Sequence, residues 1–132
     1  MKYSIGEFSV KTALSAPTLR YYEQEGLLCV ARDAAGRRVY TETDIAWVAF
    51  IKRLKETGMR LKEIERYACL RYQGDSTIGE RLKILTEHRL QVQSEKLCWE
   101  QNLLRLEEKI SYYRERLAAK REAAPNKKET GW

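Results

Sequence analysis

The residues of this sequence with the most chemistry to offer lie together in one short stretch, residues 18–23. The stretch supplies a small hydroxyl, an obligate cation and two aromatic hydroxyls, from Thr18, Arg20, Tyr21 and Tyr22. On a helix, Thr18, Tyr21 and Tyr22 share a face, because residues three and four apart are neighbours. Donors at several depths suit a surface that contacts a phosphate backbone beside base edges. An ordinary amphipathic helix with surface tyrosines fits these residues equally well, so the surrounding elements must decide.

The sequence holds few groups that could bind a soft metal ion. Its three cysteines, Cys29, Cys69 and Cys98, are widely spaced, which predicts no disulfide framework and favours a reducing cytosol. The single histidine, His88, lies almost three helical turns from Cys98, so these two cannot share a metal ion within one chain. We therefore expect neither a metal nor a cofactor. Redox or electrophile sensing by Cys69 or Cys98 stays open, although most helical cysteines are inert small hydrophobes.

Charge and hydropathy narrow the class of protein. The chain has 132 residues and a formal net charge of +6, and a basic balance favours a polyanionic partner. This charge alone does not separate nucleic acid from an anionic membrane surface. We find no apolar run long enough to cross a bilayer and no apolar signal core at the N-terminus, so we expect a cytoplasmic protein without a membrane partner. No nucleophile–base pair or phosphate loop is visible, which argues against an enzyme.

Two short helices should position the stretch at residues 18–23. Ser4 with Glu7 three residues later matches a capping box, which predicts a helix over residues 5–12. Ser15 is a second N-cap residue, and the helix after it should run over residues 16–24, with Gly26 ending it. Two short helices joined by a tight turn make a helix-turn-helix. A generic helical hairpin is the alternative.

A small β-hairpin is predicted next. Two β-prone runs, residues 27–32 and 37–40, flank a turn rich in Asp and Gly. Arg32, Arg37 and Arg38 lie on both sides of the tip. Directly after a helix-turn-helix, such a hairpin is expected to reach a phosphate backbone. The alternative is a solvated hairpin whose charges only aid solubility.

Two further helices follow the hairpin. Thr41 or Thr43 can cap the first, whose apolar stripe is Ile45, Val48, Ala49, Ile51 and Leu54, and Gly58 ends it. The second opens at Leu61 and should run to about residue 71. Arg60 and Lys62, at its start, are expected to form a second basic patch. Residues 72–75 break the pattern.

The last predicted element is one very long helix. Thr77 and Glu80 match another capping box, and no Gly or Pro follows it before Pro125. One seam position of its heptads holds Ile78, Leu85, Val92, Trp99, Leu106 and Tyr113, and the companion position holds Leu82, Leu103, Ile110 and Leu117, with Arg89 and Lys96 at the centre. Heptads of this length predict a coiled coil, most simply in a homodimer. The alternative is a helix folded back on its own domain.

This order of motifs closely resembles the MerR family of bacterial transcription regulators. The matching stretches are residues 3–8, 18–23 with 26–28, 36–40 with 44–45, and 58–59 with 61–64. The resemblance implies a mostly α-helical fold with a winged helix-turn-helix head, a small hairpin wing and a long antiparallel dimerisation helix. We expect the head at residues 1–74, the dimerisation helix at residues 75–122 and a flexible tail at residues 123–132. Residues 73–78 and 106–114 look like the subgroup associated with aldehyde and electrophile stress.

The resemblance also assigns roles. It implies a dimer that binds double-stranded promoter DNA between the elements read by RNA polymerase and activates by bending and untwisting an overlong spacer. Thr18, Arg20, Tyr21 and Tyr22 look like the major-groove and backbone set. Arg38 and Tyr40, beside Arg37, look like the phosphate contacts of the first wing, and Arg60 and Lys62 look like those of the second wing.

Two departures from the family pattern bear on regulation. Arg60 stands where the family often has a capping Ser, so the helix from Leu61 should begin more loosely. Residues 51–54 lack the cysteine that the subgroup often carries, which puts thiol sensing at that place in doubt. A small-molecule effector stays unknown. A small apolar pocket for one could be lined by Trp47, Tyr67, Tyr72, Trp99, Tyr112 and Tyr113, although core or seam packing explains these rings more simply. The other class left open is a coiled-coil scaffold with an incidental basic head.

Overall fold

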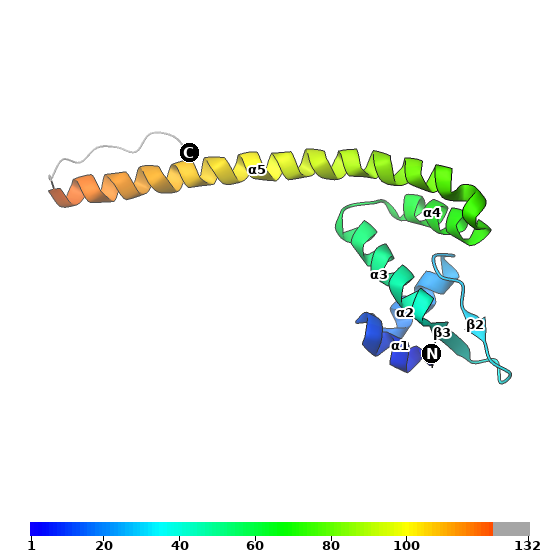
Figure 1. Cartoon of the computed structure of the whole chain (residues 1–132). Coiled ribbons are helices and arrows are strands. Elements are labelled where there is room, and N and C mark those ends of the chain that lie inside the picture. The colour runs from blue at the N-terminus through cyan, green and yellow to red at the C-terminus, as the bar shows by residue number, and fades with distance from the viewer. Residues whose placement is uncertain (123–132) are drawn as a thin grey trace. The chain divides into compact units, whose positions relative to one another are not determined.

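Helices dominate the chain, and the computed structural model describes residues 1–122 of it. The elements are β1 (Lys2–Tyr3), α1 (Ile5–Thr12), α2 (Ala16–Gln24), β2 (Ala31–Arg32), β3 (Arg38–Thr41), α3 (Glu42–Glu56), α4 (Leu61–Gln73), the 3₁₀ turn η1 (Asp75–Thr77) and α5 (Ile78–Glu122) (Figure 1). The flexible tail expected at residues 123–132 lies outside the described residues. The chain divides into two compact units, Met1–Val92 and Gln93–Trp132.

Local capping signals set the bounds of the first two helices, as predicted. Ser4 and Glu7 form a full capping box on α1, since the Glu7 N–H donates to Ser4 Oγ (3.2 Å) and the Ser4 N–H donates to Glu7 Oε1 (2.9 Å). Ser15 caps α2 by accepting from the Thr18 N–H at 3.2 Å. The helix ends in a Schellman motif, in which Gly26 has a φ of +78° and the Leu27 N–H donates to the Tyr22 carbonyl.

The sheet has one strand more than the sequence predicted. Its order is β1-β3-β2, and both pairs are antiparallel. The two-residue strand β1 pairs Tyr3 with Tyr40, and it is too short to carry a periodic pattern. The run expected at residues 27–32 is a strand only at Ala31–Arg32, because Leu27 and Leu28 turn into the core instead.

The core of the first unit lies where α1, α2, α3, α4 and the sheet meet. Within this unit, α1 packs against α2, α3 and β3 (Figure 1). The largest fully buried side chains are those of Phe8, Leu19, Tyr22, Leu27, Leu28, Tyr40, Val48, Ile51 and Ile64. Thr41 caps α3 in a second full capping box with Asp44, which decides between the two caps that the sequence allowed. The predicted stripe on α3 is confirmed for Val48, Ile51 and Leu54, which are buried.

An aromatic layer joins α3 to α4. Trp47 stacks on Tyr67 with ring centroids 5.8 Å apart, and Phe50 lies against both rings. The Trp47 indole N–H donates to the Leu27 carbonyl at 2.7 Å. The Arg71 guanidinium covers Trp47 at 4.4 Å from the ring centroid. Trp47 and Tyr67 are therefore part of the core.

The junction between α4 and α5 is built differently from the predicted capping box. The buried Thr77 hydroxyl donates to the Leu70 carbonyl at 2.5 Å instead of capping α5. The same hydroxyl accepts from Arg81 Nε at 3.1 Å. Gly74 makes the corner with φ +102° and ψ −167°, a conformation essentially confined to glycine.

The long helix α5 is confirmed and runs unbroken for 45 residues. None of its residues is buried. Near its start, Ile84 and Leu85 pack against the core of the first unit, and His88 Nε2 lies 2.8 Å from the Thr57 hydroxyl. Leu85 is therefore partly used within its own chain, although the sequence places it in the dimer seam.

Candidate nucleic-acid interface

The second helix of the helix-turn-helix, α2, has an exposed face with polar side chains and a buried face that packs into the core. Arg20 is exposed, and no hydrogen bond or ion pair joins it to another described residue. Tyr21 is 43% exposed, and the half-buried Thr18 has its hydroxyl 2.8 Å from that of Ser15. Arg20 and Tyr21 are exposed and Thr18 is partly exposed, so a ligand at the surface of α2 could reach all three side chains.

Tyr22 differs from its expected place on the DNA-contacting face of α2. Its side chain is 2% exposed and belongs to the core, so it does not share an open face with Thr18 and Tyr21. The spacing was ambiguous, because Tyr22 lies four residues after Thr18 but also three residues after Leu19, the buried anchor of the helix. Burial of the apolar pair determined which face Tyr22 occupies.

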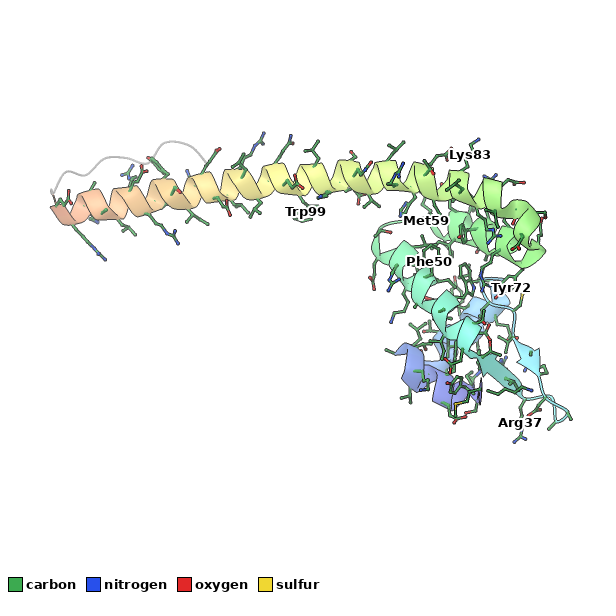
Figure 2. All side chains as sticks on the ribbon, in the orientation of Figure 1. Arg37, Phe50, Met59, Tyr72, Lys83 and Trp99 are labelled. Carbon is green, nitrogen blue, oxygen red and sulfur yellow. The ribbon has the colours of Figure 1, made fainter. Side chains whose placement is uncertain are left out.

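The tip of the hairpin presents Arg37. Its side chain is 80% exposed and points away from the strands (Figure 2). Asp33 shapes the tip by accepting from the Ala35 and Arg37 N–H groups, both at 2.9 Å, and its carboxylate lies 3.3 Å from Arg37 Nε. The hydrogen bond from the Arg37 backbone is the main cause that lowers the pKa of Asp33. The carboxylate therefore stays charged and rigidifies the turn, while the Arg37 guanidinium faces solvent.

Behind the tip, two arginines converge on one carboxylate of α2. Arg38 Nε donates to Glu23 Oε1 at 2.8 Å, and Arg32 donates to Glu23 Oε2 at 3.3 Å. The hydrogen bond to Glu23 raises the pKa of Arg38 further. No sequence pattern points to Glu23, because its partners lie 9 and 15 residues away in the chain and no local signal links them.

Tyr40 is the second residue that differs from its expected place. The resemblance assigns it a phosphate contact, but its side chain is fully buried. Its ring stacks on Phe8 with centroids 4.2 Å apart and planes 9° from parallel. Its hydroxyl is also buried and makes no hydrogen bond within the described residues, and burial raises the pKa of this phenol. In this conformation Tyr40 packs strand β3 against α1 and does not reach a surface ligand.

Arg60 and Lys62 lie at the start of α4, and both are exposed. Arg60 occupies the N-cap position with no side-chain cap, which agrees with the looser start expected from the missing Ser. The first N–H groups of a helix carry partial positive charge, and two cations beside them strengthen the attraction for an anion.

The seam of α5 is open along most of its length. Eight seam side chains are between 40% and 74% exposed, namely Ile78, Leu82, Trp99, Leu103, Leu106, Ile110, Tyr113 and Leu117. Val92 is half-buried. Trp99 is the most exposed of them and points away from the helix axis (Figure 2). Apolar side chains at heptad spacing with this exposure need a partner surface.

The cysteine, histidine and carboxylate side chains of residues 1–122 are the candidates for metal binding or thiol chemistry. Within residues 1–122, no group of three or more His, Cys, Asp or Glu side chains is arranged to hold a metal ion. Cys29, Cys69 and Cys98 are free thiols and all are exposed. None of the described helices is both long enough and apolar enough to cross a membrane.

Comparison with known proteins gives consistent matches. The family described as "MerR HTH family regulatory protein" matches residues 3–68, and the one described as "MerR, DNA binding" matches residues 45–97. An HTH-type transcriptional regulator of Haemophilus influenzae is 39% identical over 86% of this chain and 84% of its own length. The regulator AdhR of Bacillus subtilis is 38% identical over 65% of this chain and 62% of its own length. The crystal structure of HiNmlR, "a MerR family regulator lacking the sensor domain, bound to promoter DNA", is 38% identical with a TM-score of 0.78, over 89% of this chain and 94% of that one.

Proposed function

Since this chain belongs to the MerR family of DNA-binding transcriptional regulators, we propose that it acts as a homodimer that activates transcription by bending and untwisting promoter DNA. The promoter DNA would lie between the elements that RNA polymerase reads, and the protein would act in the cytoplasm. HiNmlR, which resembles this chain over most of its length, is described as bound to promoter DNA, and this supports the proposal.

DNA binding and dimerisation are proposed to use different elements of the chain. Residues 1–74 would bind DNA, with Arg20, Tyr21 and Thr18 at the major groove. Arg37 and Arg38 of the first wing and Arg60 and Lys62 of the second would contact phosphates on either side. Residues 75–122 would dimerise through the open seam of α5. A coiled-coil scaffold with an incidental basic head explains the seam equally well, but it leaves the exposed cations of the helix-turn-helix without a use.

We also propose a stress signal or small molecule as the input. Support comes from residues 73–78 and 106–114, which resemble the subgroup associated with aldehyde and electrophile stress. The cysteine-free stretch at residues 51–54 argues against thiol sensing at the subgroup's usual place. The effector itself stays unassigned.

The main support for a DNA-binding surface on α2 comes from Arg20. This exposed cation lies on the second helix of the helix-turn-helix and has no hydrogen-bond or ion-pair partner among the described residues. We expect Arg20→Ala to weaken binding to operator and random duplex alike, by about tenfold, and to reduce the slope of log affinity against log salt by about one, because one phosphate contact is lost. Fluorescence anisotropy across a salt series measures both quantities. Lys83→Ala is the control, since Lys83 is an exposed cation on α5 that lies outside the proposed interface (Figure 2). Unchanged affinity and slope for the Arg20 variant would remove Arg20 from the interface.

The activation mechanism is tested on the promoter. Two rigidly linked heads can engage straight DNA only if their spacing matches the half-sites, and otherwise the duplex must deform at a cost of about 1–6 kcal/mol. Deleting two base pairs between the promoter elements removes about 70° of twist. We expect the shortened promoter to be transcribed without the protein in reactions with purified RNA polymerase. Bound protein should then leave transcription unchanged or repress it. A two-base-pair deletion outside the spacer is the control. If the shortened promoter still needs the protein, or footprints lie far upstream, activation works by recruitment instead.

A further inference from the structure

The hairpin of the first wing contains an unfavourable pair. Arg32 and Arg38 are direct cross-strand partners in the β2–β3 register. Like charges opposite one another on two strands destabilise the pairing. These strands are also short, since β2 has only two residues and β3 has four. The hairpin therefore needs a compensating anion to keep its two strands together.

Glu23 supplies this anion from outside the hairpin. Its carboxylate uses one oxygen for Arg38 Nε (2.8 Å) and the other for Arg32 (3.3 Å). The Glu23 and Arg38 side chains are only 23% and 26% exposed, so water screens this contact less than a fully exposed ion pair. Arg32 is fixed a second time, because its other terminal nitrogen donates to the Gly36 carbonyl at 3.4 Å.

The position of Glu23 on α2 gives the contact a consequence for the interface. Glu23 lies three residues after Arg20, so it shares a side of the helix with the residue proposed to meet DNA. The ion pairs of Glu23 therefore connect the first wing directly to α2, the helix proposed to enter the major groove. Arg38 binds Glu23 only through Nε, and its two terminal nitrogens make no hydrogen bond to a described residue. Those two groups remain able to donate to a phosphate.

We propose that Glu23 is a positioning residue for DNA binding, which locks the first wing to α2 so that Arg38 and Arg37 are held at a fixed distance from Arg20. This inference rests on the proposed function, since it assigns the carboxylate a role in the same interface. The rival interpretation gives Glu23 the opposite effect. A carboxylate bonded to two arginines could instead compete with phosphates and restrain binding until DNA displaces it.

The variant Glu23→Gln separates these two interpretations by the sign of its effect. Removing a negative charge near DNA should strengthen binding by simple electrostatics. Positioning predicts the reverse, a loss of about three- to tenfold in operator affinity and a salt slope shallower by about one, because the wing contacts are no longer aligned. The matched control is Glu25→Gln, which makes the same charge change at the end of the same helix, at a residue with no side-chain ion pair among the described residues. The control should bind as well as wild type or slightly better. Anisotropy across a salt series measures all three proteins.

A second measurement needs no DNA. In the full-length protein alone, amide hydrogen exchange at residues 31–33 and 37–39 should be about threefold to tenfold faster in Glu23→Gln, while exchange in α1 and α3 stays unchanged. Glu23→Asp should recover part of the protection, since it restores the charge at a shorter reach.

Three outcomes would overturn the proposal. Tighter binding with a steeper slope would make Glu23 a competitor of phosphate. Weaker binding with an unchanged slope, or faster exchange throughout the first unit, would make its role merely structural. Unchanged binding and exchange would leave it no role. If wild-type protein fails to prefer promoter DNA, the proposed function fails, but the exchange result still tests the lock between Glu23 and the hairpin.

Discussion

A chain carrying both Leu103→Asp and Leu106→Asp is expected to be a monomer that no longer holds operator DNA. Both leucines are more than half exposed on α5 and occupy the two adjacent seam positions. Burying each in a dimer stabilises it by about 1.5–3 kcal/mol, and an unpaired carboxylate at the same place adds a desolvation cost. The dimer should therefore weaken by at least about 1,000-fold.

Sedimentation at micromolar concentration, with DNA binding measured in parallel, checks this result. The control carries Ser94→Asp and Gln101→Asp, which add the same two charges to exposed positions outside the seam, and it should remain dimeric. If the wild-type protein is a monomer at micromolar concentration, the dimer proposal is wrong. A variant that stays dimeric would show that the seam has been assigned to the wrong face of α5.

The second large effect is expected in the core beneath the wing. Phe8 is fully buried and stacks on Tyr40 of β3, so Phe8→Ala should leave a cavity and lower the free energy of unfolding by about 3–5 kcal/mol. This loss is a large fraction of the stability of a typical domain, about 5–15 kcal/mol. Phe8→Leu, which keeps most of the volume, should cost less. Chemical denaturation followed by circular dichroism at a fixed protein concentration measures the change.

Val10→Ala is the matched control, because Val10 lies on the same helix but is 83% exposed. Its effect should stay within about 0.5 kcal/mol. If Phe8→Ala costs no more than this control, the stack on Tyr40 does not hold the wing strand, and the burial of Tyr40 needs another explanation.

The parts of the fold that the sequence predicts are those with local causes. A hydroxyl, a carboxylate three residues later and a glycine at the far end specify a helix within one stretch of chain. The bounds of α1 and α2 follow from such signals at Ser4, Ser15 and Gly26. Sustained heptads without Gly or Pro predict α5 for the same reason.

The features that the sequence predicted wrongly, or did not predict, depend on tertiary packing. Tyr22 satisfied two helical spacings at once, and only the buried face of Leu19 decided between them. Tyr40 carries a hydroxyl that suits a phosphate, yet the pleat turns it toward Phe8. Thr77 looked like a helix cap, but the corner at Gly74 brings the Leu70 carbonyl within its reach. Glu23 has no local partner at all, and its role becomes visible only when α2 and the hairpin lie together.

The open seam of α5 has a consequence for the cell. A helix of 45 residues that buries none of them within its chain gains little stability from its own packing. In the proposed homodimer, the order of this helix would be linked by mass action to the concentration of a second copy. Freshly made chains at low abundance would present a fraying helix to cellular proteases, whereas paired chains would be protected. The amount of regulator would therefore have a threshold, below which degradation outpaces pairing and above which the paired form accumulates.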